Sequence, residues 1–345
     1  TTVPFRAIGA PFLNGPQLAA SMNEIGTPGA LVRPVSFRPW FDKHQGQPCH
    51  GVMLHVTNVA LFRPVATYLR LITLARQQAK DAYGVQTWSS GEEMIAAGGL
   101  DVVFVCAPTY LHAPLVIQAL RAGCHVFGEK PMALNETLCA DMSAVADECG
   151  KVLMIGQVLR FWPEYVFLKK VIDSGEYGKL HTLSMTRVGG VSTGWNGWYL
   201  DEERGGMQIF DRHIHDTDAI LWMLGLPRAV YSYGVHRDPH GEGGICHSFT
   251  HYDYGDGLVV SAEGSADAPK GFPFTAAYRA FFAGACIEFN STAKPTLKVY
   301  AGGEAQVPEL PVAAETLSSG LNISTGGPYL NEQCYFFDCL RKGVK

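Results

Sequence analysis

The stretch LDVVFVCAPTYLHAPLVIQALRAGCHVFGEKP, residues 100–131, decides the fold class. It begins with a continuous apolar run at 100–106, which predicts a parallel strand covered on both faces. Residues 112–122 predict a helix with one apolar stripe, which ends at Gly123. A second strand follows at 124–127. This strand–helix–strand order predicts a β-α-β unit of a doubly wound sheet.

The pattern continues outward from this unit on its C-terminal side. A helix at 135–149 and a strand at 152–156 extend the parallel sheet, and a helix at 161–174 follows. From residue 179 onward, alternating residues predict strands at 180–187, 229–236, 246–254, 257–266, 274–283, 285–290 and 296–300. Helices are predicted at 214–224 and 331–341. The fold class is therefore an α/β incomplete Rossmann-like parallel sheet plus an α+β domain with a large antiparallel sheet.

The N-terminal side differs in charge and composition. Residues 1–78 contain seven Lys or Arg and two acidic residues, whereas the remainder contains twenty basic and thirty acidic residues. This part is rich in Pro, Gly and Phe, with a predicted strand at 51–57 and a helix at about 64–79. We place a boundary near residue 80 and predict domains at 1–80, 81–157 and 158–345.

Composition excludes several classes of protein. The chain has 345 residues, 47% hydrophobic and 17% charged, which excludes a disordered or collagen-like chain. A net charge of −5 argues against nucleic-acid or anionic-membrane binding, and no apolar run is long enough to span a membrane. The nine cysteines, an odd number without a C-x-x-C pair, favour free thiols over a disulfide framework. With no signal-peptide pattern, this predicts a cytoplasmic protein.

A lysine stands where open α/β sheets bind ligands. Glu129, Lys130 and Pro131 directly follow a strand of the buried type, at the carboxyl end of the parallel sheet. An ammonium group there can stabilise negative charge that develops on a substrate oxygen. Position alone leaves a second interpretation open, in which Lys130 is a surface residue that begins a loop.

The densest polar cluster is DRHIHDTD, residues 211–218, at the start of an apolar helix. Asp211 and His215 are four residues apart and share a face of a helix, and a carboxylate beside an imidazole is the usual arrangement of a general base. Two alternatives remain open. Asp211 can cap the helix, or His213 and His215 can bind a metal with the acids, which we do not predict because the two imidazoles point to different faces.

Two further groups have competing interpretations. His240, Cys246, His247 and His251 look like a ligand set, but their positions in a turn and an alternating strand favour ordinary turn and sheet residues. Trp195 and Trp198 lie in a Gly-rich loop and could form the apolar floor of a sugar or polyol pocket, or simply pack.

From about residue 81 to the end, the chain resembles the Gfo/Idh/MocA family of NAD(P)-dependent oxidoreductases, and most closely its inositol-dehydrogenase-like members. The matching segments are 83–85, 101–103, 108–112, 123–134, 157, 160–165, 172–175, 205–206, 211–215 and 218. The resemblance implies Lys130, Asp211 and His215 as the catalytic set. His215 takes the proton of a substrate hydroxyl, Asp211 orients His215, and Lys130 positions the hydroxyl oxygen.

The resemblance also implies ligands and partners. NAD or NADP is the expected cofactor, and its binding residues are Pro108, Thr109, His112, Glu129, Lys130 and Gln157. A small sugar or polyol is the expected substrate, and its binding residues are Arg160, Trp195, Trp198 and His213. We expect a homo-oligomer that uses the antiparallel sheet as its interface.

Two departures from the family pattern stand out. No G-x-G-x-x-G turn occurs before residue 100, which removes the main reason to expect tight dinucleotide binding and leaves the strand at 101–106 with an apolar face and a bare edge. Residues 1–78 instead resemble a fragment of NamZ-type exo-β-N-acetylmuramidases, through segments 5–12, 29, 33–39, 49–52 and 55–57. That fragment lacks the region expected to hold the muramidase catalytic residues, so no muramidase activity is implied.

Together these observations predict an oxidoreductase that transfers a hydride between a sugar or polyol hydroxyl and NAD(P), impaired by the loss of the glycine-rich turn. Two alternatives remain open. One is NAD-dependent cleavage of a glycoside. The other is a non-catalytic sugar-binding or oligomerisation module, which the absent glycine turn favours.

Overall fold

A computed structural model describes residues 7–38, 47–58, 60–61, 64–84, 86–190, 195–207, 209–236, 244–310 and 327–344. The chain forms two compact units, which divide between Ser90 and Gly91. The boundary predicted near residue 80 falls inside a helix that continues to Tyr83. Within the described residues, no helix is both long and apolar enough to cross a membrane.

The first unit is a small antiparallel sheet with two helices. Its strands have the order β1-β3-β2. Its elements are β1 (Ala7–Ala10), α1 (Gly15–Ile25), β2 (Ala30–Phe37), β3 (Cys49–Val56) and α2 (Pro64–Tyr83). A core that includes Leu18, Met22, Val52 and Leu71 joins both helices to the sheet. Asn14 caps α1 by accepting a hydrogen bond from the Gln17 amide.

The second unit begins with the parallel sheet that the opening stretch predicts. Its strands have the order β4-β5-β6, and both pairs are parallel. Its elements are α3 (Gly91–Ala96), β4 (Val102–Val105), α4 (His112–Arg121), β5 (His125–Glu129), α5 (Glu136–Glu148) and β6 (Leu153–Gly156). Val103, Val105 and Val126 are buried with α4 and α5 in one core.

The other face of this sheet is aromatic. Phe104 on β4 stacks on Phe127 of β5 with ring centroids 5.1 Å apart, and α9 (Pro328–Lys342) packs Phe336 against both rings. Phe104 nevertheless remains 38% exposed, and β4 pairs only with β5 among the described strands. The predicted apolar face and bare edge of this strand are therefore present in the described structure.

The rest of the second unit is an eight-stranded sheet with the order β14-β13-β12-β11-β7-β10-β9-β8. Its strands are β7 (Leu180–Gly190), β8 (Ala229–His236), β9 (Ile245–Asp253), β10 (Val259–Ala268), β11 (Thr275–Phe282), β12 (Ala285–Asn290), β13 (Leu297–Ala301) and β14 (Glu304–Gln306). The sheet predicted as antiparallel is in fact mixed, because β10 pairs with β7 in parallel. The fold class is otherwise confirmed.

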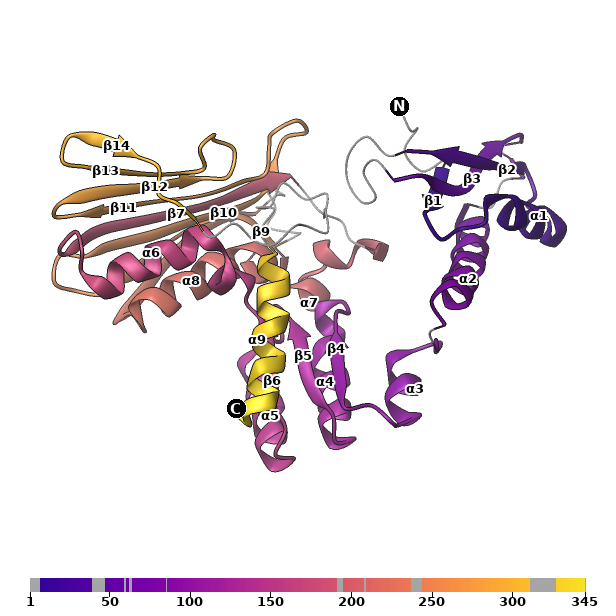
Figure 1. Ribbon diagram of the computed structural model, residues 1–345, viewed down its shortest axis with the longest axis horizontal. Coiled ribbons are helices and arrows are strands. Elements are labelled where there is room, and N and C mark those ends of the chain that lie inside the picture. The colour runs from indigo at the N-terminus through magenta and orange to yellow at the C-terminus, as the bar shows by residue number, and fades with distance from the viewer. Residues whose placement is uncertain are drawn as a thin grey trace. The chain divides into compact units, whose positions relative to one another are not determined.

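Two helices cover one face of the large sheet, as Figure 1 shows. They are α6 (Pro163–Ser174) and α8 (Ile214–Leu224), and their apolar faces join the alternating inward residues of the strands in the largest core. A π-helical turn (Ile209–His213) leads directly into α8, and the short helix α7 (Glu202–Gly205) precedes it. The clustered polar residues 211–218 thus run through this turn into the first turn of α8.

Candidate active site

An ion pair joins the two motifs that the sequence singles out. Lys130, immediately after β5, donates from Nζ to Oδ1 of Asp211 at 2.9 Å and to the Asp211 carbonyl at 2.6 Å. The two side chains are 16% and 18% exposed. A contact between residues 81 positions apart in sequence thus connects the carboxyl end of the parallel sheet with the turn that leads into α8.

Asp211 has two further polar neighbours, which sequence reasoning did not find. Tyr199 forms a side-chain hydrogen bond with Asp211, and burial together with the carboxylate raises the pKa of Tyr199 to about 12. Arg212 Nε lies 3.9 Å from Oδ2 of Asp211, and the Arg212 guanidinium donates to the carbonyls of Gly190 and Ser265. The carboxylate therefore lies among a lysine, a phenol and a guanidinium.

His215 is the second residue of α8, and its Nδ1 is enclosed without a hydrogen-bond partner in the described residues. Burial lowers the pKa of His215 well below its ordinary value, and the positive charges of Lys130 and Arg187 lower it further. Asp211 interacts with Lys130 instead of forming a described hydrogen bond with His215. The role in which Asp211 orients His215 therefore stays a prediction.

A second ion pair lies beside this group and was missed from the sequence. The side chains of Arg187 on β7 and Asp216 on α8 are 7% and 0% exposed, and the guanidinium contacts both carboxylate oxygens at 2.9 and 3.0 Å. Arg187 occupies the inward phase of a strand whose other inward residues include Leu183 and Met185. A single charge at a buried position of an alternating strand was the signal that could have revealed it.

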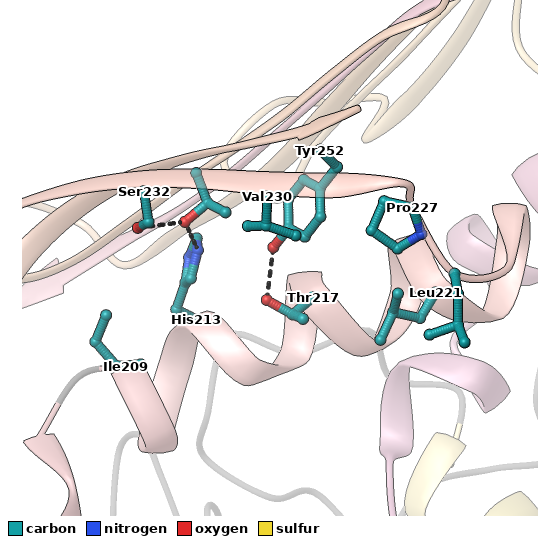
Figure 2. Close-up of a pocket in the computed structure, with 10 residues that line it drawn as sticks. Ile209, His213, Thr217, Leu221, Pro227, Val230, Ser232 and Tyr252 are labelled. Atoms are coloured by element: carbon teal, nitrogen blue, oxygen red, sulfur yellow. Dashed lines mark hydrogen bonds between the residues drawn. The ribbon is translucent and has the colours of Figure 1, made fainter. Parts of the chain in front are cut away.

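His213 faces a different place from His215. Its Nε2 lies 2.8 Å from Thr250 Oγ1, which in turn lies 2.9 Å from Ser232 Oγ (Figure 2). These residues line a mainly apolar pocket of about 430 Å³ between α8 and the strands β8 and β9. Burial lowers the pKa of His213. The structure thus places this predicted substrate residue in a pocket beside α8, with one ring nitrogen already bonded to a protein hydroxyl.

The predicted cofactor residues lie at the carboxyl ends of the parallel strands. Pro108 and Thr109 follow β4, Glu129 ends β5, and Gln157 follows β6. Gln157 Oε1 is enclosed and unpartnered within the described residues. His112 differs, because it is 2% exposed and its ring nitrogens each lie 2.8 Å from a backbone carbonyl, those of Pro131 and Ala107. The His112 side chain therefore connects the loop after β4 with the loop after β5 through these two carbonyls.

Of the remaining predicted substrate residues, the structure describes the side chains of Arg160 and Trp198. Arg160 forms a bidentate pair with Asp218 on α8, at 2.9 and 2.7 Å. Trp198 stacks on Tyr199 with ring centroids 3.9 Å apart, which brings it next to the partner of Asp211. The side chain of Trp195 lies outside the described residues.

No group of three or more potential metal ligands occurs among the described side chains. His247 instead pairs with Glu263 at 3.0 Å, and Cys246 Sγ donates to the Val235 carbonyl. His240 lies outside the described part of the chain. All nine cysteines are free thiols.

A buried acid on α9 completes the group of residues that were missed. Glu332 is 1% exposed, and its Oε1 has no partner in the described residues. Burial, together with the negative charges of Glu129 and Asp218, raises the pKa of Glu332 to about 8. Glu332 therefore carries a proton at neutral pH on the side of the parallel sheet that α9 covers.

Comparison with known proteins separates two segments of the chain. A family model described as GFO/IDH/MocA C-terminal domain matches residues 165–284, and one described as exo-β-N-acetylmuramidase NamZ, C-terminal, matches residues 1–102. D-glucoside 3-dehydrogenase of Escherichia coli K12 is 34% identical over 163 residues, which are 46% of this chain and 46% of that protein. The chain thus spans about half the length of this relative.

Two further matches support the division. Peptidoglycan β-N-acetylmuramidase NamZ of Bacillus subtilis 168 is 47% identical over 72 residues, which are 21% of this chain and 17% of that protein. Levoglucosan dehydrogenase in complex with NADH and levoglucosan superposes with a TM-score of 0.66 at 21% identity, covering 79% of each chain, which establishes a shared fold. Residues 165–284 are therefore similar to the C-terminal domain of GFO/IDH/MocA proteins, and residues 1–102 of the same chain are similar to the C-terminal region of NamZ.

Proposed function

We propose that the protein is an oxidoreductase that transfers a hydride between a hydroxyl-bearing carbon of a sugar or polyol and NAD(P). The observation that carries this proposal is the ion pair of Lys130 with Asp211, which lies four residues before His215. The ammonium of Lys130 is bonded to Asp211, and its charge bears on His215. A relative that shares 34% identity is named a glucoside dehydrogenase, which supports the same chemistry.

Each of the three residues has a distinct task in this proposal. Because Nδ1 of His215 is enclosed, Nε2 is the ring nitrogen left to take the proton of the substrate hydroxyl. The lowered pKa of His215 keeps the imidazole neutral and able to accept this proton. Lys130 stabilises negative charge on the hydroxyl oxygen as the proton leaves. Asp211 holds the ammonium in place through two hydrogen bonds.

A nicotinamide cofactor supplies the hydride acceptor for this reaction when it is bound. The residues present fit its nicotinamide half, because Gln157 offers an enclosed, unpartnered oxygen at the carboxyl end of β6 that can accept from a carboxamide. The fit to a pyrophosphate is poorer, since the sequence contains no G-x-G-x-x-G turn. We therefore propose that the protein binds its cofactor, NAD or NADP, weakly.

The proposed oligomer uses the face of the large sheet opposite α6 and α8. Exposed aromatic side chains gather there, among them Tyr231, Tyr233 and Phe249 at 68%, 67% and 49% exposure. Register places Tyr233 beside Phe249, so the two contribute to one patch. Exposed apolar patches of this kind mark interfaces. Sedimentation of the protein and of a Tyr233→Lys variant tests this interface, and a purely monomeric wild type contradicts it.

We also propose a reducing, cytoplasmic location, which the nine free thiols support. Thiol labelling of the protein inside intact cells tests it. Extensive disulfide formation there contradicts the proposal.

The central experiment measures nicotinamide absorbance with NAD or NADP and a panel of sugars and polyols. Reduction of the cofactor by the wild type, with loss in Lys130→Ala, is the expected result. Absence of turnover with every sugar contradicts the proposal.

One observation favours a second candidate, a non-catalytic sugar-binding module: the sequence lacks the glycine turn that binds a pyrophosphate. A titration of nicotinamide fluorescence separates the two candidates. No cofactor binding, combined with heat released on sugar binding in a calorimeter, supports the module over the enzyme.

A further inference from the structure

The environment of His215 contains more positive than available negative charge. The three carboxylates nearest to it in sequence are each bonded to a cation: Asp216 to Arg187, Asp218 to Arg160 and Asp211 to Lys130. The charge of Lys130, just after β5, and that of Arg187 on β7 both act on the imidazole. The positive charges of Lys130 and Arg187 thus disfavour protonation of the ring, while the nearby carboxylates are held in ion pairs.

Arg187 is built into this place by three elements of the fold. From β7 it donates through Nε and Nη2 to the two carboxylate oxygens of Asp216, at 2.9 and 3.0 Å. Nη2 also donates to the hydroxyl of Tyr165, at 3.1 Å, which is 1% exposed on α6. Since Asp216 directly follows His215, this fork fixes the first turn of α8 at the residue next to the proposed base.

We propose that Arg187 is a positioning residue for His215: its bidentate pair with Asp216 fixes the start of α8, and its charge adds to burial in keeping the neighbouring imidazole neutral and therefore able to accept a proton. This inference rests on the proposed function of His215 as a base. It assigns to Arg187 a role that acts through His215. A lysine could supply the charge at this place but not the planar fork.

The physical argument concerns the second proton of the imidazole. Protonation of His215 would create a third cation next to Lys130 and Arg187, in surroundings that already disfavour charge through burial. The pKa of His215 falls for these reasons, burial first and the two cations after it. Loss of the Arg187 charge therefore returns the pKa of His215 toward its ordinary value, while burial and Lys130 still lower it.

The test uses the full chain and the double variant Arg187→Gln/Asp216→Asn. Both charges are removed together, because removal of either one alone would leave the other buried and unpaired. The titration of His215 is followed by proton NMR, and its signal is identified by its loss in His215→Gln. In the double variant we expect the His215 titration to move to higher pH.

Steady-state turnover gives a second readout. If His215 must be neutral to act, the acid limb of the pH–rate profile moves to higher pH with the titration, and the ratio of the rate at pH 8 to the rate at pH 5 grows. In Arg187→Lys the charge stays but the fork is lost. There we expect a lower kcat with the acid limb unmoved.

A matched control repeats the same chemical change elsewhere. Arg228 and Asp253 form an exposed pair, with Nη2 3.0 Å from Oδ1 and side chains 67% and 54% exposed. The variant Arg228→Gln/Asp253→Asn should leave both the His215 titration and the pH–rate profile unchanged.

The outcomes separate this inference from the proposed function. An unchanged His215 titration in the Arg187→Gln/Asp216→Asn variant overturns the role of Arg187, even if the wild type oxidises a sugar. A shifted titration in a protein without any turnover supports the charge effect of Arg187 and overturns the enzymatic function. A shift of the titration and of the acid limb together supports both.

Discussion

Two ion pairs near His215 share their chemistry and differ in their surroundings. Lys130 and Asp211 are 16% and 18% exposed, and the lysine also donates to a backbone carbonyl. Arg187 and Asp216 are 7% and 0% exposed, and a planar fork matches both carboxylate oxygens. The first pair connects the parallel sheet to α8, whereas the second connects α8 to the large sheet.

This difference in burial leads us to expect that the Lys130–Asp211 pair acts in turnover and that the Arg187–Asp216 pair stabilises the fold. A compact ammonium with partial access to solvent can exchange its partner for a substrate oxygen at modest cost. A buried guanidinium fork cannot leave its carboxylate without stranding a charge away from water. We therefore expect changes at Lys130 to affect turnover and changes at Arg187 or Asp216 to affect stability first. The first two of the four predictions below test that division.

The largest effect is expected for Lys130→Ala. Removal of the cation that stabilises the substrate oxygen should lower kcat about 1,000-fold, in the range known for loss of one such electrostatic group. Lys179, whose Nζ donates to the Asp256 carbonyl at an exposed site, provides the control, and Lys179→Ala should keep full activity. Equal loss in both variants, measured by nicotinamide absorbance, would contradict a special role for Lys130.

The second prediction concerns the buried pair of Arg187 and Asp216 and uses the variant Asp216→Asn. This change leaves the Arg187 guanidinium buried without its counter-charge, and we expect the free energy of unfolding to fall by about 3 kcal/mol. Urea denaturation followed by fluorescence measures the change. The exposed Asp253→Asn variant, at the partner of Arg228, should cost well under about 1 kcal/mol. A similar cost for the two variants would remove the contrast between the buried and exposed pairs.

Glu332 extends the comparison to a buried acid whose Oε1 has no partner in the described residues. Its pKa is about 8 when folded and 4.5 ordinarily, so unfolding releases a proton between these pH values and stability falls as pH rises through that window. Relative to wild type, Glu332→Gln should gain on the order of 2 kcal/mol between pH 4.5 and pH 8.

Thermal unfolding across this pH range checks the Glu332 prediction. Glu148→Gln, on the exposed last turn of α5, serves as the control and should follow the wild-type curve. Parallel curves for wild type and Glu332→Gln would show that the buried acid ionises normally.

The smallest effect is expected for Thr250→Val. The hydroxyl of Thr250 joins His213 Nε2 to Ser232 (Figure 2), and its loss leaves the imidazole nitrogen without that partner. We expect a loss of about 1 kcal/mol in stability with kcat retained. Thr292→Val removes an exposed hydroxyl that bonds Asn290, and it should cost less. A large fall in kcat would move His213 and its pocket into the catalytic machinery.

Periodicity predicted the strands and helices of the second unit well, because continuous apolar runs at 102–105 and alternation at 275–290 reflect burial directly. The parallel pairing of β7 with β10 was not predictable from alternation, which is the same in parallel and antiparallel strands with one buried face. His112 was expected at the cofactor because of its place in a motif. Its ring instead bridges two backbone carbonyls, a contact that sequence spacing does not reveal.

The sequence by itself determined which residue types carry the chemistry and where they lie along the chain, since Glu129–Pro131 and Asp211–His215 stand out against their apolar neighbours. Only the tertiary structure decided their partners. It paired Asp211 with Lys130 rather than with His215, and it paired Arg187 of β7 with Asp216 of α8. The physical reason is that the free energy of a charge depends on burial and on the few ångströms around it, which residues far apart in sequence supply.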